Sequence, residues 1–196
     1  MKKHIIVLCL AAAAVLAAGT ANADSISGKI GVTGKIGLNI PADNDSDFFH
    51  NDTDVGLVGG GGVIYGIDHN WAAKAEVTRA SFGSETGDFG VTDISFGAQY
   101  RFTPQNRLVP FAGAGFDILI NDYYPNFNAS RNVDTTLGAH LSGGVDYFLQ
   151  RQLALTAELK GVLAPNVDIT DRFGNHVGNF DPSSLSATVG VRYFFN

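Results

Sequence analysis

One histidine and one serine are spaced for nucleophilic chemistry. His140 and Ser142 are two residues apart in a segment that alternates polar and apolar residues, so both side chains point to the same face. A serine nucleophile needs a histidine base and an orienting acid within hydrogen-bond reach. Glu158, on the next alternating segment, is the candidate acid, and Lys160 stands close to it. The polar face on which they lie points away from a lipid substrate, so we expect a hydrogen-bonded interior histidine and no enzyme.

An aspartate-rich stretch has some of the spacing of a calcium loop. Residues 43–47 read Asp-Asn-Asp-Ser-Asp, and Asp54 stands at the twelfth position. Such a loop needs glycine at its sixth position, where this sequence has Phe48, and helices on both sides, which no pattern here indicates. We therefore expect no metal site and no cofactor, while divalent-cation binding by residues 43–54 stays open.

A third set of side chains is suited to ion pairing. They occupy the polar positions of alternating segments, where six are positive and five negative: Lys29, Lys35, Lys74, Arg101, Lys160 and Arg192 against Glu76, Asp93, Asp117, Asp146 and Glu158. Exposed surface charges need not balance. Near-equal numbers on one face indicate a closed space in which each charge has a counter-charge.

Eight segments with a period of two must position these charges. They cover residues 25–40, 55–67, 71–79, 91–102, 108–120, 137–148, 153–164 and 184–195. Strict alternation predicts strands, and the first is much longer than the about 5–6 residues usual in soluble proteins. The connections alternate between short (68–70, 103–107, 149–152) and long (41–54, 82–90, 121–134, 165–182). This layout predicts an all-β fold, an eight-stranded antiparallel transmembrane β-barrel.

The position of charge and aromatic residues indicates which face meets lipid. A soluble barrel would turn its apolar face inward. Here the apolar face carries one charge, Arg79, at a predicted strand end, and it gathers aromatic residues beside the short turns: Tyr65, Trp71, Tyr100, Phe102, Tyr147, Tyr193 and Phe195. Aromatic rings concentrate at membrane interfaces. We therefore expect the apolar face to contact lipid.

Composition and the N-terminal sequence set the class and the destination. A length of 196 residues suits one domain, a net charge of −6 argues against nucleic acid, and a single cysteine excludes a disulfide framework. Residues 1–23 combine two lysines, an apolar run at 5–18 and Ala21-Asn22-Ala23, as a cleaved signal peptide does. We expect cleavage before Asp24, a mature barrel domain of residues 24–196, and export to the outer membrane of a Gram-negative bacterium.

Several stretches carry family resemblances. Val191, Tyr193 and Phe195 resemble the C-terminal signal with which the barrel assembly machinery inserts outer-membrane barrels. The stretches KIGLNIPAD (35–43), VPFAGAG (109–115) and GGVDYF (143–148) before Arg151 resemble the OmpW/AlkL family, one of the OmpA/OmpX-like groups of eight-stranded barrels. That resemblance implies passive uptake of small hydrophobic molecules through a narrow channel with a lateral exit. His140-Leu141-Ser142 is similar to the His-x-Ser pair of lipid A deacylases.

The order of residues along each strand predicts how the lumen is divided. We expect a charged plug at the periplasmic side, formed by Lys29, Lys74, Glu76, Arg101, Asp146 and Arg192. Val58, Leu119 and Val162 fall near the external end, with Phe111 lower, and could guide an apolar solute. It would leave sideways where glycines or Pro110 weaken the wall. Alternatively, these apolar residues pack against inward-folded loops.

The long loops leave a second role open. They hold twelve acidic residues against Arg131 and Arg172: Asp43, Asp45, Asp47, Asp52, Asp54, Glu85, Asp88, Asp122, Asp134, Asp168, Asp171 and Asp181. Such loops suit divalent cations between lipopolysaccharide phosphates. A structural or adhesive barrel that acts through these loops is the alternative to a channel, with outer-membrane lipid and lipopolysaccharide as its surroundings.

Overall fold

The computed structural model describes residues 25–42, 55–84, 87–103, 106–125, 132–133, 135–170 and 176–195. The predicted signal peptide and the aspartate-rich stretch at 43–54 lie outside these residues. The strands are β1 (Ile30–Pro41), β2 (Gly56–Gly66), β3 (Trp71–Ser84), β4 (Gly87–Arg101), β5 (Leu108–Pro125), β6 (Asn132–Val133), β7 (Thr136–Phe148), β8 (Leu153–Leu163), β9 (Val167–Thr170), β10 (His176–Phe180) and β11 (Ser184–Phe194).

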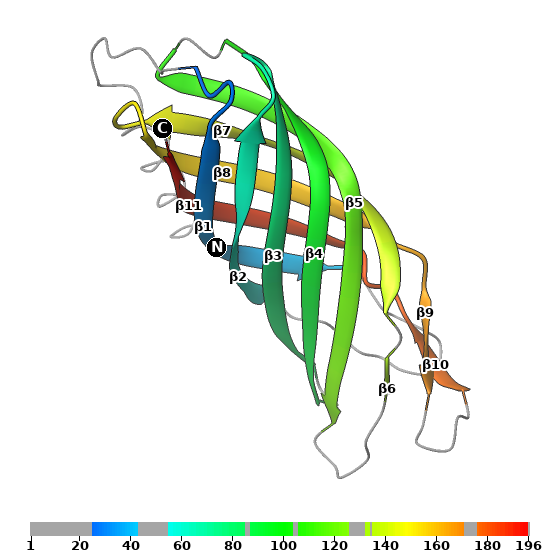
Figure 1. Cartoon of the computed structure of the whole chain (residues 1–196). Helices are drawn as coiled ribbons and strands as arrows, with labels where there is room; N and C mark the ends of the chain where they lie inside the picture. The colour runs from blue at the N-terminus through cyan, green and yellow to red at the C-terminus, as the bar shows by residue number, and fades with distance from the viewer. Residues whose placement is uncertain are drawn as a thin grey trace.

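Eight of the strands form a closed antiparallel barrel (Figure 1). Their order around the wall is β1-β11-β8-β7-β5-β4-β3-β2, and β1 closes the barrel by pairing with both β2 and β11. The short strands β6, β9 and β10 form a separate sheet beyond the barrel at its long-loop end. The predicted fold class is confirmed.

The two faces of the wall have the reverse polarity of a soluble protein. Outward apolar side chains are widely exposed, as in Ile36 at 70% and Phe116 at 75%, whereas the inward Asp146 and Arg192 are completely buried. Among the described residues, no helix is long and apolar enough to cross a membrane. Inward glycines let neighbouring strands approach closely: a Cβ at Gly60 would overlap the carbonyl oxygen of Val77.

Three strands extend further than the alternation predicts. β3 continues past Arg79 to Ser84, β4 begins at Gly87, and β5 continues to Pro125, with pairing maintained along both seams. The outward positions in these extensions include Ser81 and Asp122, so the apolar face ends while the backbone ladder continues. Hydrophobic alternation therefore locates the membrane-facing part of each strand rather than its end.

The first strand begins later than predicted. Ile30 opens β1, and the preceding residues make a turn in which the Lys29 amide donates to the Ile26 carbonyl oxygen at 2.9 Å. Gly28 has φ of +74°, a conformation that favours glycine. The alternation of the predicted strand 25–40 places Ile26 on the apolar face expected to contact lipid. This prediction is wrong, because the turn ends the alternation and the Ile26 side chain is buried inside the barrel.

Candidate functional site

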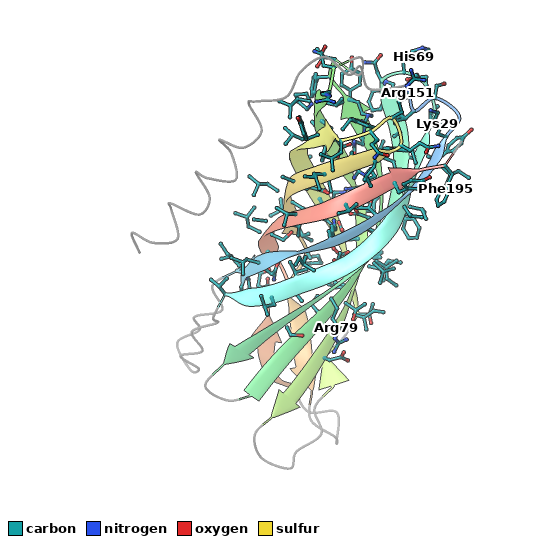
Figure 2. The ribbon with its side chains drawn as sticks, turned by 90° about the vertical axis from the view of Figure 1, so that its left-hand side faces the viewer. Lys29, His69, Arg79, Arg151 and Phe195 are labelled. Carbon is teal, nitrogen blue, oxygen red and sulfur yellow. The ribbon has the colours of Figure 1, made fainter. Side chains whose placement is uncertain are left out.

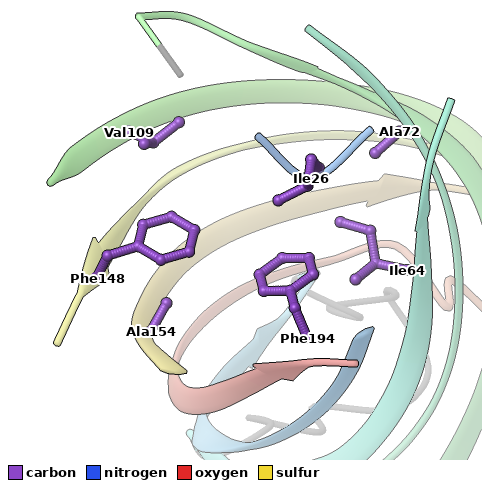
Figure 3. Close-up of a cluster of buried hydrophobic side chains, with 7 residues drawn as sticks. All are labelled: Ile26, Ile64, Ala72, Val109, Phe148, Ala154 and Phe194. Carbon is purple, nitrogen blue, oxygen red and sulfur yellow. The ribbon is translucent and has the colours of Figure 1, made fainter. Parts of the chain in front are cut away.

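An apolar cluster closes the lumen at the end with the short turns, which we expect to face the periplasm. We call it the stopper; its members are Ile26, Ile64, Ala72, Val109, Phe148, Ala154 and Phe194. Figure 3 shows Ile26 in the middle of a ring formed by the others. The Gly28 amide donates to the Gly66 carbonyl oxygen at 2.7 Å and the Gly66 amide to that of Lys29 at 3.0 Å, which fixes the segment that carries Ile26.

Directly beside the stopper, two arginines share one aspartate. We call this group the inner cluster. Asp146 Oδ2 accepts from Arg101 Nη1 at 2.7 Å and from Arg192 Nη1 at 2.6 Å, and Arg192 Nε donates to Thr33 Oγ1 at 2.9 Å. The strands β1, β4, β7 and β11 supply these residues, so the cluster ties the lumen wall together from several sides.

Aromatic rings face the surplus positive charge of the inner cluster. The Arg101 guanidinium carbon lies 5.8 Å from the ring centroid of Phe148 and 5.9 Å from that of Phe194, and the Arg192 carbon lies 5.8 Å from that of Phe111. A ring face attracts a guanidinium at this range. Stopper and inner cluster therefore form one packed unit.

Two lysines and two glutamates alternate in the middle of the lumen. In this middle cluster Lys35 Nζ lies 2.7 Å from Glu76 Oε2, and Lys74 Nζ lies 2.6 Å from Glu158 Oε1. The remaining two sides of the square are Lys74–Glu76 at 3.2 Å and Lys35–Glu158 at 3.6 Å. All four side chains are buried, and their charges cancel.

The outer cluster contains the histidine and one lysine between two aspartates. Lys160 Nζ contacts Asp93 Oδ2 and Asp117 Oδ1, each at 2.6 Å, and His140 Nδ1 lies 2.8 Å from Asp117 Oδ2. The acid beside His140 is therefore Asp117, whereas the candidate Glu158 pairs with Lys74. Ser142 Oγ is buried with no hydrogen-bond partner among the described residues, so the serine is not coupled to a base.

A small cavity lies above the outer cluster. Val58, Ala80, Val91, Leu119 and Val162 form the apolar part of its wall, Asn39, Thr78, Ser184, Ser186 and Thr188 form a polar part, and Lys35, Asp93 and Lys160 lie at its floor. Its volume of about 30 Å³ has room for one or two waters, compared with about 150 Å³ in a cavity that binds benzene. The structure thus brings Val58, Leu119 and Val162 together as the sequence suggests, whereas Phe111 lies deeper, against Arg192.

The structure redistributes the predicted plug. Arg101, Asp146 and Arg192 lie together near the periplasmic end, while Lys74 and Glu76 belong to the middle cluster. Lys29 is half-buried and precedes β1, at the end of the barrel that also carries His69, Arg151 and Phe195 (Figure 2). The three clusters then contain five positive and five negative side chains, with His140 counted as neutral.

The sequence does not predict the stopper, and it predicts a charged plug at the end of the lumen where the apolar stopper lies. The prediction counts Lys35 and Glu158 as inward charges but does not assign them to the plug. The inward parity of Ile64, Val109 and Phe194 matches that of the charged residues on the same strands and could have revealed an apolar layer. In the part of the chain that the structure describes, no group of three His, Cys, Asp or Glu residues is arranged to hold a metal.

The outward aromatic residues gather at the periplasmic end. Trp71 and Tyr100 meet edge to face with ring centroids 5.1 Å apart, and Tyr193 and Phe195 do so at 5.2 Å. Val191, Tyr193 and Phe195 are 48%, 39% and 48% exposed, so the three residues of the predicted insertion signal share the lipid-facing side.

One charged pair lies on the outward face towards the other end. Arg79 Nη1 lies 3.1 Å from Asp122 Oδ2 and donates to Thr92 Oγ1 at 2.9 Å, and both side chains of the ion pair are substantially exposed (Figure 2). The pair crosses β3, β4 and β5. It ends the apolar band on this side of the barrel.

The comparison with protein families agrees with this architecture. The family model described as "Outer membrane protein beta-barrel domain" matches residues 8–195. The chain belongs to this family. It is accordingly an outer-membrane protein of a Gram-negative bacterium, with membrane lipid around its apolar face. A search of curated proteins finds no match to the sequence.

Solved structures share the fold at low identity. OprG from Pseudomonas aeruginosa has a TM-score of 0.69 at 13% identity, covering 88% of this chain and 100% of its own. Neisserial surface protein A has a TM-score of 0.63 at 18% identity, covering 86% of this chain and 98% of its own. A major outer membrane protein from Thermus thermophilus has a TM-score of 0.54 at 13% identity, covering 85% of this chain and 98% of its own. These likenesses concern the fold alone.

Proposed function

We propose that this barrel passes small apolar solutes from its outer end into the membrane, not through an axial aqueous pore. The observation that carries the proposal is that Val58, Leu119 and Val162 line one side of a cavity directly above a floor of ion pairs. The resemblance of three sequence stretches to the OmpW/AlkL family supports the same role.

The layers below the cavity argue against an axial route. A solute moving straight down would have to separate the outer, middle and inner clusters and then displace the stopper. Removing one partner from a buried ion pair typically costs about 3–5 kcal/mol. An apolar solute cannot replace the lost hydrogen bonds, so it would stop at the outer cluster.

The cavity must widen to admit a solute. The cavity volume of about 30 Å³ is far below the volume of about 300–1,000 Å³ that is typical of ligand sites. Passage thus requires movement of the side chains or strands around it, and a lateral exit uses the same movement. The pathway is a set of closely packed apolar residues rather than an open tube.

Uptake into liposomes tests this function. The refolded protein should admit an apolar probe faster than a hydrophilic probe of similar size. The double variant Val58→Asp/Leu119→Asp should take up the apolar probe no faster than protein-free liposomes, whereas the matched Val58→Ile/Leu119→Met variant keeps an apolar wall and should retain uptake. Equal uptake of both probes by the native protein would indicate an aqueous pore and overturn the proposal.

A structural or adhesive role is the second candidate. It is favoured by the acidic character of the long loops and by the extension of β3, β4 and β5 beyond the apolar band. Its partners would be lipopolysaccharide phosphates bridged by divalent cations, or surfaces contacted by the loops. No uptake of either probe, together with calcium-dependent binding to lipopolysaccharide vesicles, would favour this candidate.

We further propose that the protein is not an enzyme and that Val191, Tyr193 and Phe195 engage the barrel assembly machinery. Small outer-membrane barrels of this family are generally non-enzymatic. A Ser142→Ala variant should leave lipid A unchanged relative to the native protein, whereas replacing Tyr193 and Phe195 with serine should reduce insertion into the outer membrane.

A further inference from the structure

The outer cavity and a groove on the lipid-facing side lie on opposite sides of the same wall. The groove crosses β5, β7 and β8, and its lining includes Phe116, His140, Gly161, Val162, Leu163 and Ser184. Val162 and Ser184 also line the cavity. Gly161 faces outward with no side chain, and it is next to Val162, which bounds the cavity from inside.

We propose that apolar solutes leave the lumen through the outer end of the seam between β7 and β8, beside Val162. The inference rests on the proposed function and specifies where its lateral step occurs. The β7–β8 ladder ends at the Ala139–Leu163 pair, whereas β7 continues to Thr136 with β5 as its partner. Beyond this pair, Gly138 stands opposite Ala164 across the seam.

The other edge of β8 is held beyond its ladder. The β8–β11 ladder ends at Val162–Ser184, and the preceding Ser183 then bridges the gap. Ser183 Oγ accepts from the Ala164 amide at 3.1 Å and donates to the Ala164 carbonyl oxygen at 3.3 Å, while the Ser183 carbonyl oxygen accepts from the Ala42 amide at 2.8 Å. At Ala164, one residue beyond the last β7–β8 pair, β8 is therefore hydrogen-bonded on its β11 side, and among the described residues it has no such bond to β7.

The residues along this route suit an apolar solute. Val162 and Gly138 are inward and uncharged, and the outward Leu137 and Leu163 are 70% and 73% exposed to the membrane. His140 is the nearest ionisable residue on β7, and Asp117 holds it within the outer cluster. A solute that passes Val162 at the seam consequently moves from the apolar part of the cavity wall to the apolar outer face.

Two other candidate exits in the described part of the wall do not connect with the apolar part of the cavity. At Pro110 the register of β5 with β7 continues without a shift, and the lumen behind it is filled by Phe111 and the inner cluster. A second outward groove, over Gly34 and Gly190, shares only Lys35 with the cavity. Lys35 is bound to Glu76, so a charged residue blocks that route.

A reversible disulfide across the seam tests the route. A Cβ at Gly138 would lie 3.4 Å from Ala164 Cβ, close to the about 3.5–4.5 Å Cβ separation of disulfides. The sequence has one cysteine, Cys9, within the predicted signal peptide, so a mature double variant would contain only the two new thiols. The test variant is Gly138→Cys/Ala164→Cys. Its matched control is Leu38→Cys/Leu57→Cys, a directly opposed outward pair across β1 and β2.

Apolar uptake is measured in liposomes before oxidation, after oxidation and after addition of a reductant. We expect the oxidised seam variant to fall to the level of protein-free liposomes and to recover on reduction, while the oxidised control keeps its uptake. Full uptake by the oxidised seam variant would overturn this route but leave the proposed function standing. No apolar uptake by the native protein would overturn both. The reduced seam variant serves as its own folding control.

Discussion

The two ends of the lumen are built on the same alternation but filled differently. At the periplasmic end the inward positions hold Phe148, Phe194, Arg101 and Arg192, and each is at most 2% exposed. At the outer end they include Gly138, Ala80 and Ser184, and a cavity remains. An eight-stranded barrel is just wide enough for side chains to fill. The size of the inward residues, rather than the pattern, therefore decides where this barrel is closed.

The ends also differ in charge. The inner cluster pairs two arginines with one aspartate, and the outer cluster pairs one lysine with two aspartates when His140 is neutral. The middle cluster is neutral. The surplus positive charge faces aromatic rings. The cavity above the outer cluster is bordered by charges of both signs, because Lys35 and Lys160 line it together with Asp93.

The largest expected effect contrasts an aspartate from each end. Asp146→Ala should lower the free energy of unfolding by about 3–5 kcal/mol because it leaves two arginines buried without a counter-charge. Asp93→Ala should cost less, about 1.5–3 kcal/mol, because Lys160 keeps Asp117 at 2.6 Å and lies near the cavity. Unfolding by denaturant in lipid vesicles measures both, followed by the fluorescence of Trp71, the single tryptophan.

The double variant Asp146→Leu/Arg101→Leu is the control for the inner cluster. This variant lacks one buried arginine as well as the aspartate. Its loss of unfolding free energy should be smaller than the sum of the losses of the two single variants, because fewer buried charges stay unpaired. If Asp146→Ala and Asp93→Ala lowered the free energy of unfolding equally, the two ends of the lumen would not differ in how their charges are paired.

What the sequence could predict follows from its period of two. Alternation gives the parity of Asp146, Arg192 and Val162 correctly because successive strand side chains point to opposite faces. Alternation gives the wrong face for Ile26 because the chain turns at Gly28. The alternating pattern of residue types continues through this turn and therefore does not reveal it. It also leaves open which charges pair, since the partners of Lys74 come from β3 and β8, and their contacts depend on how far neighbouring strands are shifted.

The next effect concerns the centre of the stopper. Ile26→Ala should lower the free energy of unfolding by about 2 kcal/mol, because the buried side chain fills the space between Phe148, Phe194 and Ile64. Uptake of a hydrophilic probe should remain at the level of protein-free liposomes, since the three ionic clusters still close the lumen. A rise in hydrophilic uptake would show that the stopper, rather than the ion pairs, is the barrier.

A smaller stability effect with a larger functional one is expected at Val162. Val162→Ala should cost about 1 kcal/mol, because its side chain already borders a cavity and loses few packed neighbours. Apolar uptake should increase, since the change enlarges the cavity and thins the wall beside the β7–β8 seam. Val109→Ala, at a fully packed inward position, is the matched control and should destabilise the barrel more without raising uptake. Equal apolar uptake by both variants would show that the size of the cavity does not control transport.

The smallest expected effect lies in a periplasmic turn, the counterpart of the long loops at the other end. Asp68 Oδ1 accepts hydrogen bonds from the amides of Trp71 and Asn70, each at 2.7 Å. These bonds, the one from Trp71 first, lower the pKa of the exposed Asp68 carboxyl below its usual 3.8. A carboxyl with a lowered pKa in the folded state stabilises that state above its unfolded pKa, and the stabilisation disappears as the pH falls through the folded pKa.

The variant Asp68→Asn isolates this charge, because it keeps an acceptor oxygen but cannot ionise. The native protein should therefore be slightly more resistant to denaturant than the variant at about pH 6 and lose that advantage at about pH 2. Comparing the two proteins cancels the other carboxyls, which titrate in both. A difference independent of pH would mean that the turn depends on the shape of the side chain rather than on its charge.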